Sequence, residues 1–168
     1  ITLKFFAAVT EFSRAQQISL AGVHFFWADE RCVPPDDSES NFSAAQTAFF
    51  RPLGIAAEKI HRILGEQPPE RAAAFANADI KRIVPVHAGG QPMLDLIFLG
   101  MGEDAHVASL FPQEAEAAGA NPAVYRAITH SPKPPPNRVT LGYAALAAAR
   151  QVWVLASGNG KEVALQDS

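Results

Sequence analysis

Residues 94–112 read Leu94-Asp-Leu-Ile-Phe-Leu-Gly-Met-Gly-Glu-Asp-Ala-His-Val-Ala-Ser-Leu-Phe-Pro112, an apolar run followed by a polar turn. The run predicts a strand buried on both faces of a parallel sheet. Two glycines after it allow a sharp turn close to a ligand, and Val107–Phe111 predicts a short helix ended by Pro112. Ligands of open α/β sheets bind beyond the carboxyl ends of strands, where Asp104 and His106 lie. A carboxylate beside an imidazole suits general acid–base chemistry, so we interpret the turn as a catalytic loop.

The rest of the chain alternates predicted helices and strands. We expect strands at 23–28, 60–63, 94–99, 124–129, 138–141 and 152–156, and helices at 1–12, 40–50, 68–80, 143–150 and 161–168. This alternation predicts a three-layer α/β/α domain with a mainly parallel sheet. At 168 residues, the chain is expected to form a single domain, 1–168, which is large enough to bury about 70% of its unfolded-chain surface.

The composition excludes several classes of function. Hydrophobic residues make up 48% of the chain and charged residues 18%, which is ordinary for a soluble globular protein. The net charge of −3 predicts no nucleic-acid partner and no anionic membrane. The single cysteine, Cys32, fits a reducing compartment, and no apolar run approaches the roughly 18 residues of a membrane span. We therefore expect a cytoplasmic protein.

Cofactor and metal sites are not predicted. Gly100-Met-Gly-Glu-Asp-Ala105 matches the dinucleotide pattern Gly-x-Gly-x-x-Ala, but residues 113–120 are not strand-like and supply no ribose-binding acid, so we reject a dehydrogenase. No paired-histidine or paired-cysteine spacing points to a metal. We interpret His24 as a core or lining residue, and the remaining histidines outside the loop as surface residues: His61, His87 and His130.

Two further polar segments follow predicted strands. Asp29-Glu-Arg-Cys-Val-Pro-Pro35 comes directly after the strand at 23–28, and its spacing alone favours a solvated loop over a functional one. Ser157-Gly-Asn-Gly-Lys161 precedes a predicted helix, whose N-terminal amides and dipole favour a phosphate. An ordinary glycine-rich turn with a surface lysine explains this second segment equally well.

These segments together carry a family resemblance. Gly100-Met-Gly-Glu-Asp-Ala-His-Val-Ala-Ser-Leu-Phe-Pro112 resembles the signature of the 6-phosphogluconolactonases, which share a fold with the glucosamine-6-phosphate deaminases and ribose-5-phosphate isomerases. Trp27-Ala-Asp-Glu-Arg-Cys-Val-Pro34, followed by Glu39-Ser-Asn-Phe42, is similar to the family's second signature. The resemblance implies hydrolysis of 6-phospho-D-glucono-1,5-lactone to 6-phospho-D-gluconate in the oxidative pentose phosphate pathway, without a metal or cofactor.

The resemblance also assigns roles to residues of this chain. His106 becomes the base that takes a proton from water and returns it to the ring oxygen, and Asp104 would orient its imidazole. Asp29 is a second acid near the site. The predicted residues are therefore His106, Asp104 and Asp29 for catalysis, and Arg31, Arg138, Lys161, Gly100 and Gly102 for substrate and phosphate.

The sequence departs from the family pattern in two kinds of place. The family has Gly where Ala105 stands and Thr where Val107 stands, and a glycine at 105 suits a positive φ that alanine tolerates poorly. The chain also opens directly in a helical pattern, whereas the family has a strand and a Ser-Gly-Gly-Ser-Thr-Pro phosphate loop before it. It ends in a helix without a cap. We therefore expect a sequence truncated at both ends.

Two alternative functions stay open at this point. A glucosamine-6-phosphate deaminase or sugar-phosphate isomerase would share the fold, but the deaminases carry a glutamate where this chain has Phe111. A non-catalytic sugar-phosphate sensor would keep the phosphate ligands without needing Asp104 and His106. The favoured partner is a small sugar-phosphate lactone, and the expected assembly is a monomer or a weak homodimer.

Overall fold

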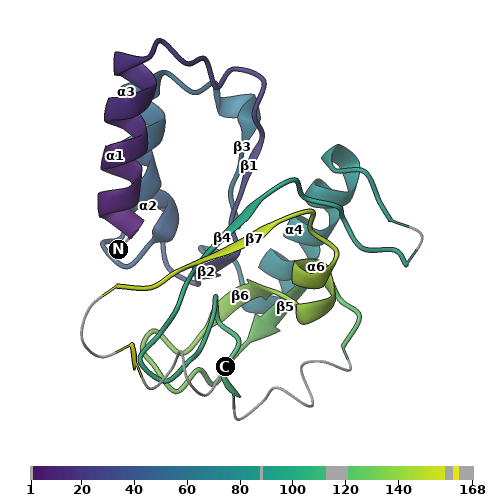
Figure 1. Ribbon diagram of the computed structural model, residues 1–168. Helices are drawn as coiled ribbons and strands as arrows, with labels where there is room; N and C mark the ends of the chain where they lie inside the picture. The colour runs from purple at the N-terminus through teal and green to yellow at the C-terminus, as the bar shows by residue number, and fades with distance from the viewer. Residues whose placement is uncertain (1, 88, 113–120, 158–160, 163–168) are drawn as a thin grey trace.

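The computed structural model describes residues 2–87, 89–112, 121–157 and 161–162. Figure 1 shows a layer of strands with α1, α2 and α3 on one side and α4 and α6 on the other. The predicted three-layer α/β/α fold is confirmed. Its helices are α1 (Thr2–Ala15), α2 (Asn41–Ala45), α3 (Arg51–Leu53), α4 (Pro69–Ile83) and α6 (Tyr143–Ala147). Its strands are β1 (Phe25–Phe26), β2 (Asp29–Arg31), β3 (Ile60–His61), β4 (Ile97–Gly100), β5 (Tyr125–Ile128), β6 (Arg138–Leu141) and β7 (Val152–Leu155).

The strands form two parallel pairs and one antiparallel sheet. β1 pairs with β3 and β4 pairs with β7, both in parallel. β6 lies between β2 and β5 and runs antiparallel to both. The segment after β1, predicted as a loop, is thus the short strand β2. Its register places Asp29 opposite Thr140 and Arg31 opposite Arg138.

Neither β4 nor β7 is covered on both faces, which corrects the prediction: β4 is buried on one face only, and Val152, Trp153 and Val154 of β7 are all exposed. Ile97 and Leu99 are buried, whereas Phe98 between them is 38% exposed. On the exposed face, Phe98 contacts Phe5 of α1 and Trp153 of β7. Phe5 of α1 therefore covers part of this face.

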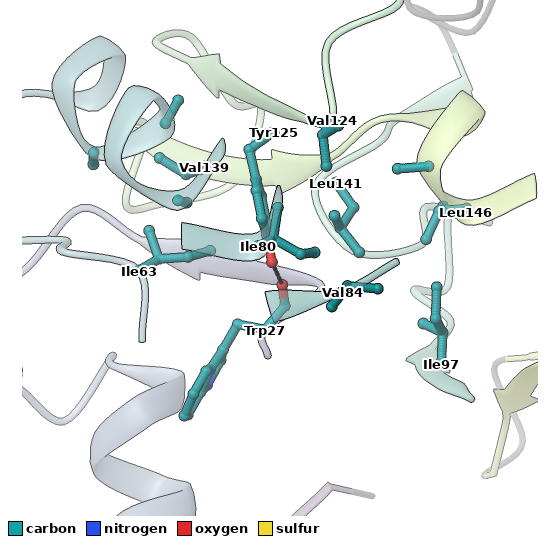
Figure 2. Close-up of a cluster of buried hydrophobic side chains, with 14 of the residues drawn as sticks. Trp27, Ile63, Ile80, Val84, Ile97, Val124, Tyr125, Val139, Leu141 and Leu146 are labelled. Carbon is teal, nitrogen blue, oxygen red and sulfur yellow. Dashed lines mark hydrogen bonds between the residues drawn. The ribbon is translucent and has the colours of Figure 1, made fainter. Parts of the chain in front are cut away.

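The main core lies between α4 and the antiparallel sheet (Figure 2). As predicted, a proline starts α4, and the helix buries an alanine-rich face of Ala72, Ala73, Ala76 and Ile80. Tyr125 of β5 donates its hydroxyl hydrogen to the carbonyl of Trp27 at 2.8 Å, the bond drawn in Figure 2. Burial raises the pKa of Tyr125, so the phenol stays a neutral donor.

Glu30 of β2 connects the sheet to α2. The residue is only 2% exposed. Its carboxylate accepts hydrogen bonds from the backbone amides of Asn41 (2.8 Å) and Phe42 (2.7 Å). The Arg31 amide and the Ser40 hydroxyl donate to the same carboxylate. The first amides of a helix have no intrahelical acceptor. Glu30 therefore caps α2 from a neighbouring strand, next to Ser40, which is the N-cap residue.

The predicted helix at 40–50 begins at Asn41 as expected and continues through a π-helical turn, Gln46–Phe50, into α3. α1 packs against this turn, where Phe6 stacks on Phe49 with ring centroids 5.5 Å apart. The strand expected at 60–63 is shorter than predicted and ends at His61. Within the described residues, no helix is long and apolar enough to span a membrane.

Replacing Glu30 by glutamine should lower the free energy of unfolding by about 1–3 kcal/mol. The NH₂ group of the glutamine would face the backbone N–H groups at the start of α2, and neither could accept a hydrogen bond from the other. Urea denaturation followed by tryptophan fluorescence measures this change. Glu58→Gln is the matched control, since Glu58 is exposed, and its effect should stay within about 0.5 kcal/mol. Equal effects of the two substitutions would contradict the capping role of Glu30.

Candidate active site

The loop after β4 brings Asp104 and His106 together. Nδ1 of His106 lies 2.6 Å from Oδ1 of Asp104. An ionised carboxylate can only accept, so Nδ1 carries the hydrogen, and in the neutral imidazole Nε2 has a free lone pair. The predicted pair therefore has the geometry of a general base held in one tautomer by a carboxylate.

Lys133 is a site residue that the sequence analysis missed. Its Nζ donates to Oδ1 of Asp104 at 2.9 Å and lies 3.4 Å from Nδ1 of His106. Burial opposes ionisation of Asp104, but the hydrogen bonds from Lys133 and His106 outweigh it and lower its pKa below the ordinary value of 3.8. Lys133 lies in the proline-rich loop before β6, and only the way this loop folds over the site shows its contact with Asp104.

Gly102 has a steric reason to be glycine. A Cβ atom at this position would overlap the ring of His106 and the carboxylate of Asp104. Its amide donates to the carbonyl of His106 at 2.8 Å, which closes the loop on itself. Gly102 thus lets the imidazole fold back over the loop, and its amide is already occupied.

The loop backbone is strained at two alanines. Ala105 has φ +61° and Ala108 has φ +50°, a left-handed conformation that costs an ordinary L-residue about 1–2 kcal/mol. The expectation of a positive φ at position 105 is confirmed. The short helix predicted at 107–111 is wrong, because the left-handed Ala108 breaks it and Val107 instead forms an isolated bridge with Leu110.

Phe111 forms the wall behind the imidazole. Its ring stacks on that of His106 with centroids 4.8 Å apart and planes inclined by 29°. The residue is 1% exposed. At the position where the deaminases carry a glutamate, this chain therefore has the apolar ring of Phe111, which has no proton to transfer.

Asp29 does not contact His106 among the described residues. Its Oδ2 accepts the hydroxyl hydrogen of Ser109 at 2.7 Å, and the side-chain amide of Asn41 lies 3.4 Å from its Oδ1. Ser109 belongs to the same loop as His106 and is completely buried. Asp29 therefore reaches the catalytic loop through Ser109.

Arg138 is buried, and its guanidinium faces the proline-rich loop. It donates to the carbonyls of Lys133, Pro134 and Pro135 at 2.9–3.1 Å. Burial, followed by the charge of Arg31, lowers its pKa. These donors are engaged within the protein, so a role for Arg138 as a phosphate ligand stays a prediction.

The remaining predicted residues lie around this centre. Arg31 donates to the carbonyl of Glu39, and its Nε has no hydrogen-bond partner among the described residues. Gly100 ends β4, where it pairs with Leu155. Lys161 is partly buried, but most of the predicted phosphate turn (158–160) and of the final helix (163–168) lies outside the described residues. The described residues contain no cluster of side chains suited to hold a metal ion.

A family model described as "Glucosamine-6-phosphate isomerases/6-phosphogluconolactonase" matches residues 2–168. The chain belongs to this family. It is 37% identical over 153 residues to a 6-phosphogluconolactonase of Mycobacterium tuberculosis, a match that covers 89% of this chain and 62% of that protein. It is 46% identical over 94 residues to the 6-phosphogluconolactonase of Treponema pallidum, a match that covers 56% of this chain and 39% of that protein.

A solved structure supports the same assignment. The crystal structure of a 6-phosphogluconolactonase from Thermotoga maritima superposes with a TM-score of 0.84 at 30% identity, covering 98% of this chain and 69% of that one. The chain spans less than two thirds of the length of the curated relatives described above. The family and the fold are therefore established, and the activity of the whole protein is a proposal.

Lys133→Met should raise the pKa of Asp104, because the carboxylate loses its ammonium partner. In the wild type, the folded pKa lies below the unfolded one, so the pair stabilises the fold above about pH 4, and this contribution is lost as the pH falls further. Carboxyl ¹³C NMR titration of Asp104 measures the change. Lys59→Met is the matched control. An Asp104 titration unchanged by Lys133→Met would show that the contact is absent in solution.

Proposed function

We propose that this protein hydrolyses 6-phospho-D-glucono-1,5-lactone to 6-phospho-D-gluconate in the oxidative pentose phosphate pathway, in the cytoplasm. The observation that carries the proposal is the hydrogen bond between Asp104 and His106, which leaves Nε2 of the imidazole as a base. The similarity to 6-phosphogluconolactonases over most of the chain supports the choice of substrate.

The chemistry needs one base that later acts as an acid. Nε2 of His106 takes a proton from water while the water oxygen attacks the lactone carbonyl. The tetrahedral intermediate then collapses, the bond from C1 to the ring oxygen breaks, and His106 returns the proton to that oxygen. Asp104 stabilises the imidazolium formed in between, and Lys133 keeps Asp104 ionised. A general base of this kind contributes roughly 10²–10⁴-fold to the rate.

Two amides of the loop at 100–105 are not free to stabilise the oxyanion of the intermediate. The amide of Gly102 donates to the carbonyl of His106, and that of Ala105 donates to the carbonyl of Gly102. We therefore assign the oxyanion to donors other than these two amides. The mechanism, as proposed, uses no metal ion or cofactor.

The phosphate of the substrate is assigned to cationic side chains at the edge of the site. Arg31 projects from the same face of β2 as Asp29, because alternate residues of a strand share a face. Its side chain is 28% exposed, so the outer part of its guanidinium is open to a phosphate oxygen. Lys161 is assigned to the same phosphate from the segment after β7, as the resemblance implies.

The alternative functions are less well supported. A deaminase would need a proton carrier where Phe111 stacks on His106. A sensor that only binds sugar phosphates would not need an imidazole held by an ionised carboxylate and a lysine. Among the described residues, no contact favours either alternative.

His106→Ala in the full-length protein should lower kcat for the phosphorylated lactone by two to four orders of magnitude and change KM little, because the base acts in the transition state. Acid release from fresh lactone, corrected for spontaneous hydrolysis, gives both constants. His87→Ala is the control, since His87 is an exposed histidine of the turn before β4. If His106→Ala stays within threefold of the wild type, His106 is not the base.

A further inference from the structure

We propose that Asp29 is a positioning residue and not an acid–base group: with Ser109 and Arg138 it anchors the two loops that carry His106 and Lys133. This inference rests on the proposed lactonase function, which it deepens by assigning Asp29 a role. It is carried by a chain of hydrogen bonds that runs from β2 through the fully buried Ser109 to β6.

Both the hydroxyl and the backbone amide of Ser109 donate hydrogen bonds to the antiparallel sheet. Its hydroxyl donates to Oδ2 of Asp29 at 2.7 Å, and its amide donates to Oγ1 of Thr140 at 3.2 Å. Asp29 and Thr140 are direct partners across β2 and β6. The catalytic loop is thus fixed to two neighbouring strands three residues after His106.

The loop needs such an anchor because its own backbone is strained. Ala105 and Ala108 both adopt positive φ values, and conformations of this kind persist only where the surroundings impose them. Ser109 directly follows the second of these alanines. Without the bond to Asp29, Ala108 would be free to relax, and the imidazole of His106 would move away from Gly102 and Asp104.

Arg138 couples the second loop to the same anchor. One guanidinium nitrogen lies 3.4 Å from the hydroxyl oxygen of Ser109, and the others donate to carbonyls at 133–135. This arrangement places Lys133 where its ammonium reaches Asp104. The same network of hydrogen bonds therefore positions both the loop that carries Asp104 and the loop that carries Lys133.

Each oxygen of the Asp29 carboxylate already faces a donor of the protein. Ser109 occupies Oδ2, and the side-chain amide of Asn41 approaches Oδ1 at 3.4 Å. Asn41 also donates to the backbone carbonyl of Asp29 at 2.9 Å, which holds the residue in place. The bond to Ser109 requires one acceptor oxygen, which an amide supplies, and the NH₂ group of the amide then faces the Asn41 side chain only at the longer distance of 3.4 Å.

The test compares Asp29→Asn, Asp29→Ala and Ser109→Ala in the full-length protein. Asp29→Asn should keep kcat within about fivefold, because its oxygen still accepts from Ser109, whereas the two alanine variants should lose tenfold or more with KM within threefold. The double alanine variant should be no worse than either single one, since the two residues act through one bond. Thr10→Val is the matched control. It also removes one buried hydroxyl group, which donates to the carbonyl of Ala48, but this group belongs to α1 and is not part of the network around Asp29.

A readout without substrate separates this inference from the proposed function. The ¹H–¹⁵N signals of the His106 ring should shift in both alanine variants and keep their wild-type positions in Asp29→Asn and Thr10→Val. A wild type that does not hydrolyse the lactone would overturn the proposed function, and the ring signals would still decide the positioning role. If Asp29→Asn loses activity as severely as Asp29→Ala while the ring signals stay unchanged, or if Ser109→Ala matches the wild type in both rate and ring signals, the inference is wrong.

Discussion

The site depends on the antiparallel pairing of β2 with β6. This pairing sets Asp29 against Thr140 and Arg31 against Arg138, so two segments more than 100 residues apart supply one polar surface. Placing two arginines directly opposite is unfavourable in itself. The carbonyls of the proline-rich loop, which accept from Arg138, and the Glu39 carbonyl, which accepts from Arg31, offset that repulsion. Glu30, on the other face of β2, fixes the same strand to α2.

On this surface the catalytic loop is held in a conformation that it would not adopt alone. Two alanines with positive φ place His106 over Gly102, with Phe111 behind the ring and Asp104 at Nδ1. Local strain of this kind is typical of functional sites, where the surrounding structure compensates for it. The compensation comes from the bonds of Ser109 to Asp29 and Thr140, so the position of His106 depends on β2 and β6 as well as on its own loop.

The sequence was sufficient wherever neighbouring residues decide the structure. Whereas the positive φ at Ala105 was expected from the family's glycine at that position, the apolar run at 94–99, the proline start of α4 and the pairing of Asp104 with His106 all follow from local chemistry. The strand β2 did not, because Asp-Glu-Arg has low strand propensity and owes its conformation to β6 and α2. Lys133 and the burial of Arg138 were likewise hidden, since both depend on how a distant loop folds over β6. The apolar runs of β4 and β7 also predicted more burial than these strands have in the structure.

The most direct measurement compares kcat/KM of the full-length protein for 6-phosphoglucono-1,5-lactone and for the unphosphorylated lactone. Each charge-assisted hydrogen bond to the phosphate is worth about 1.5–3 kcal/mol. Two such bonds, from Arg31 and Lys161, predict a preference of about 100-fold or more for the phosphorylated substrate. Equal values for the two lactones, or no acceleration over spontaneous hydrolysis, would contradict the account.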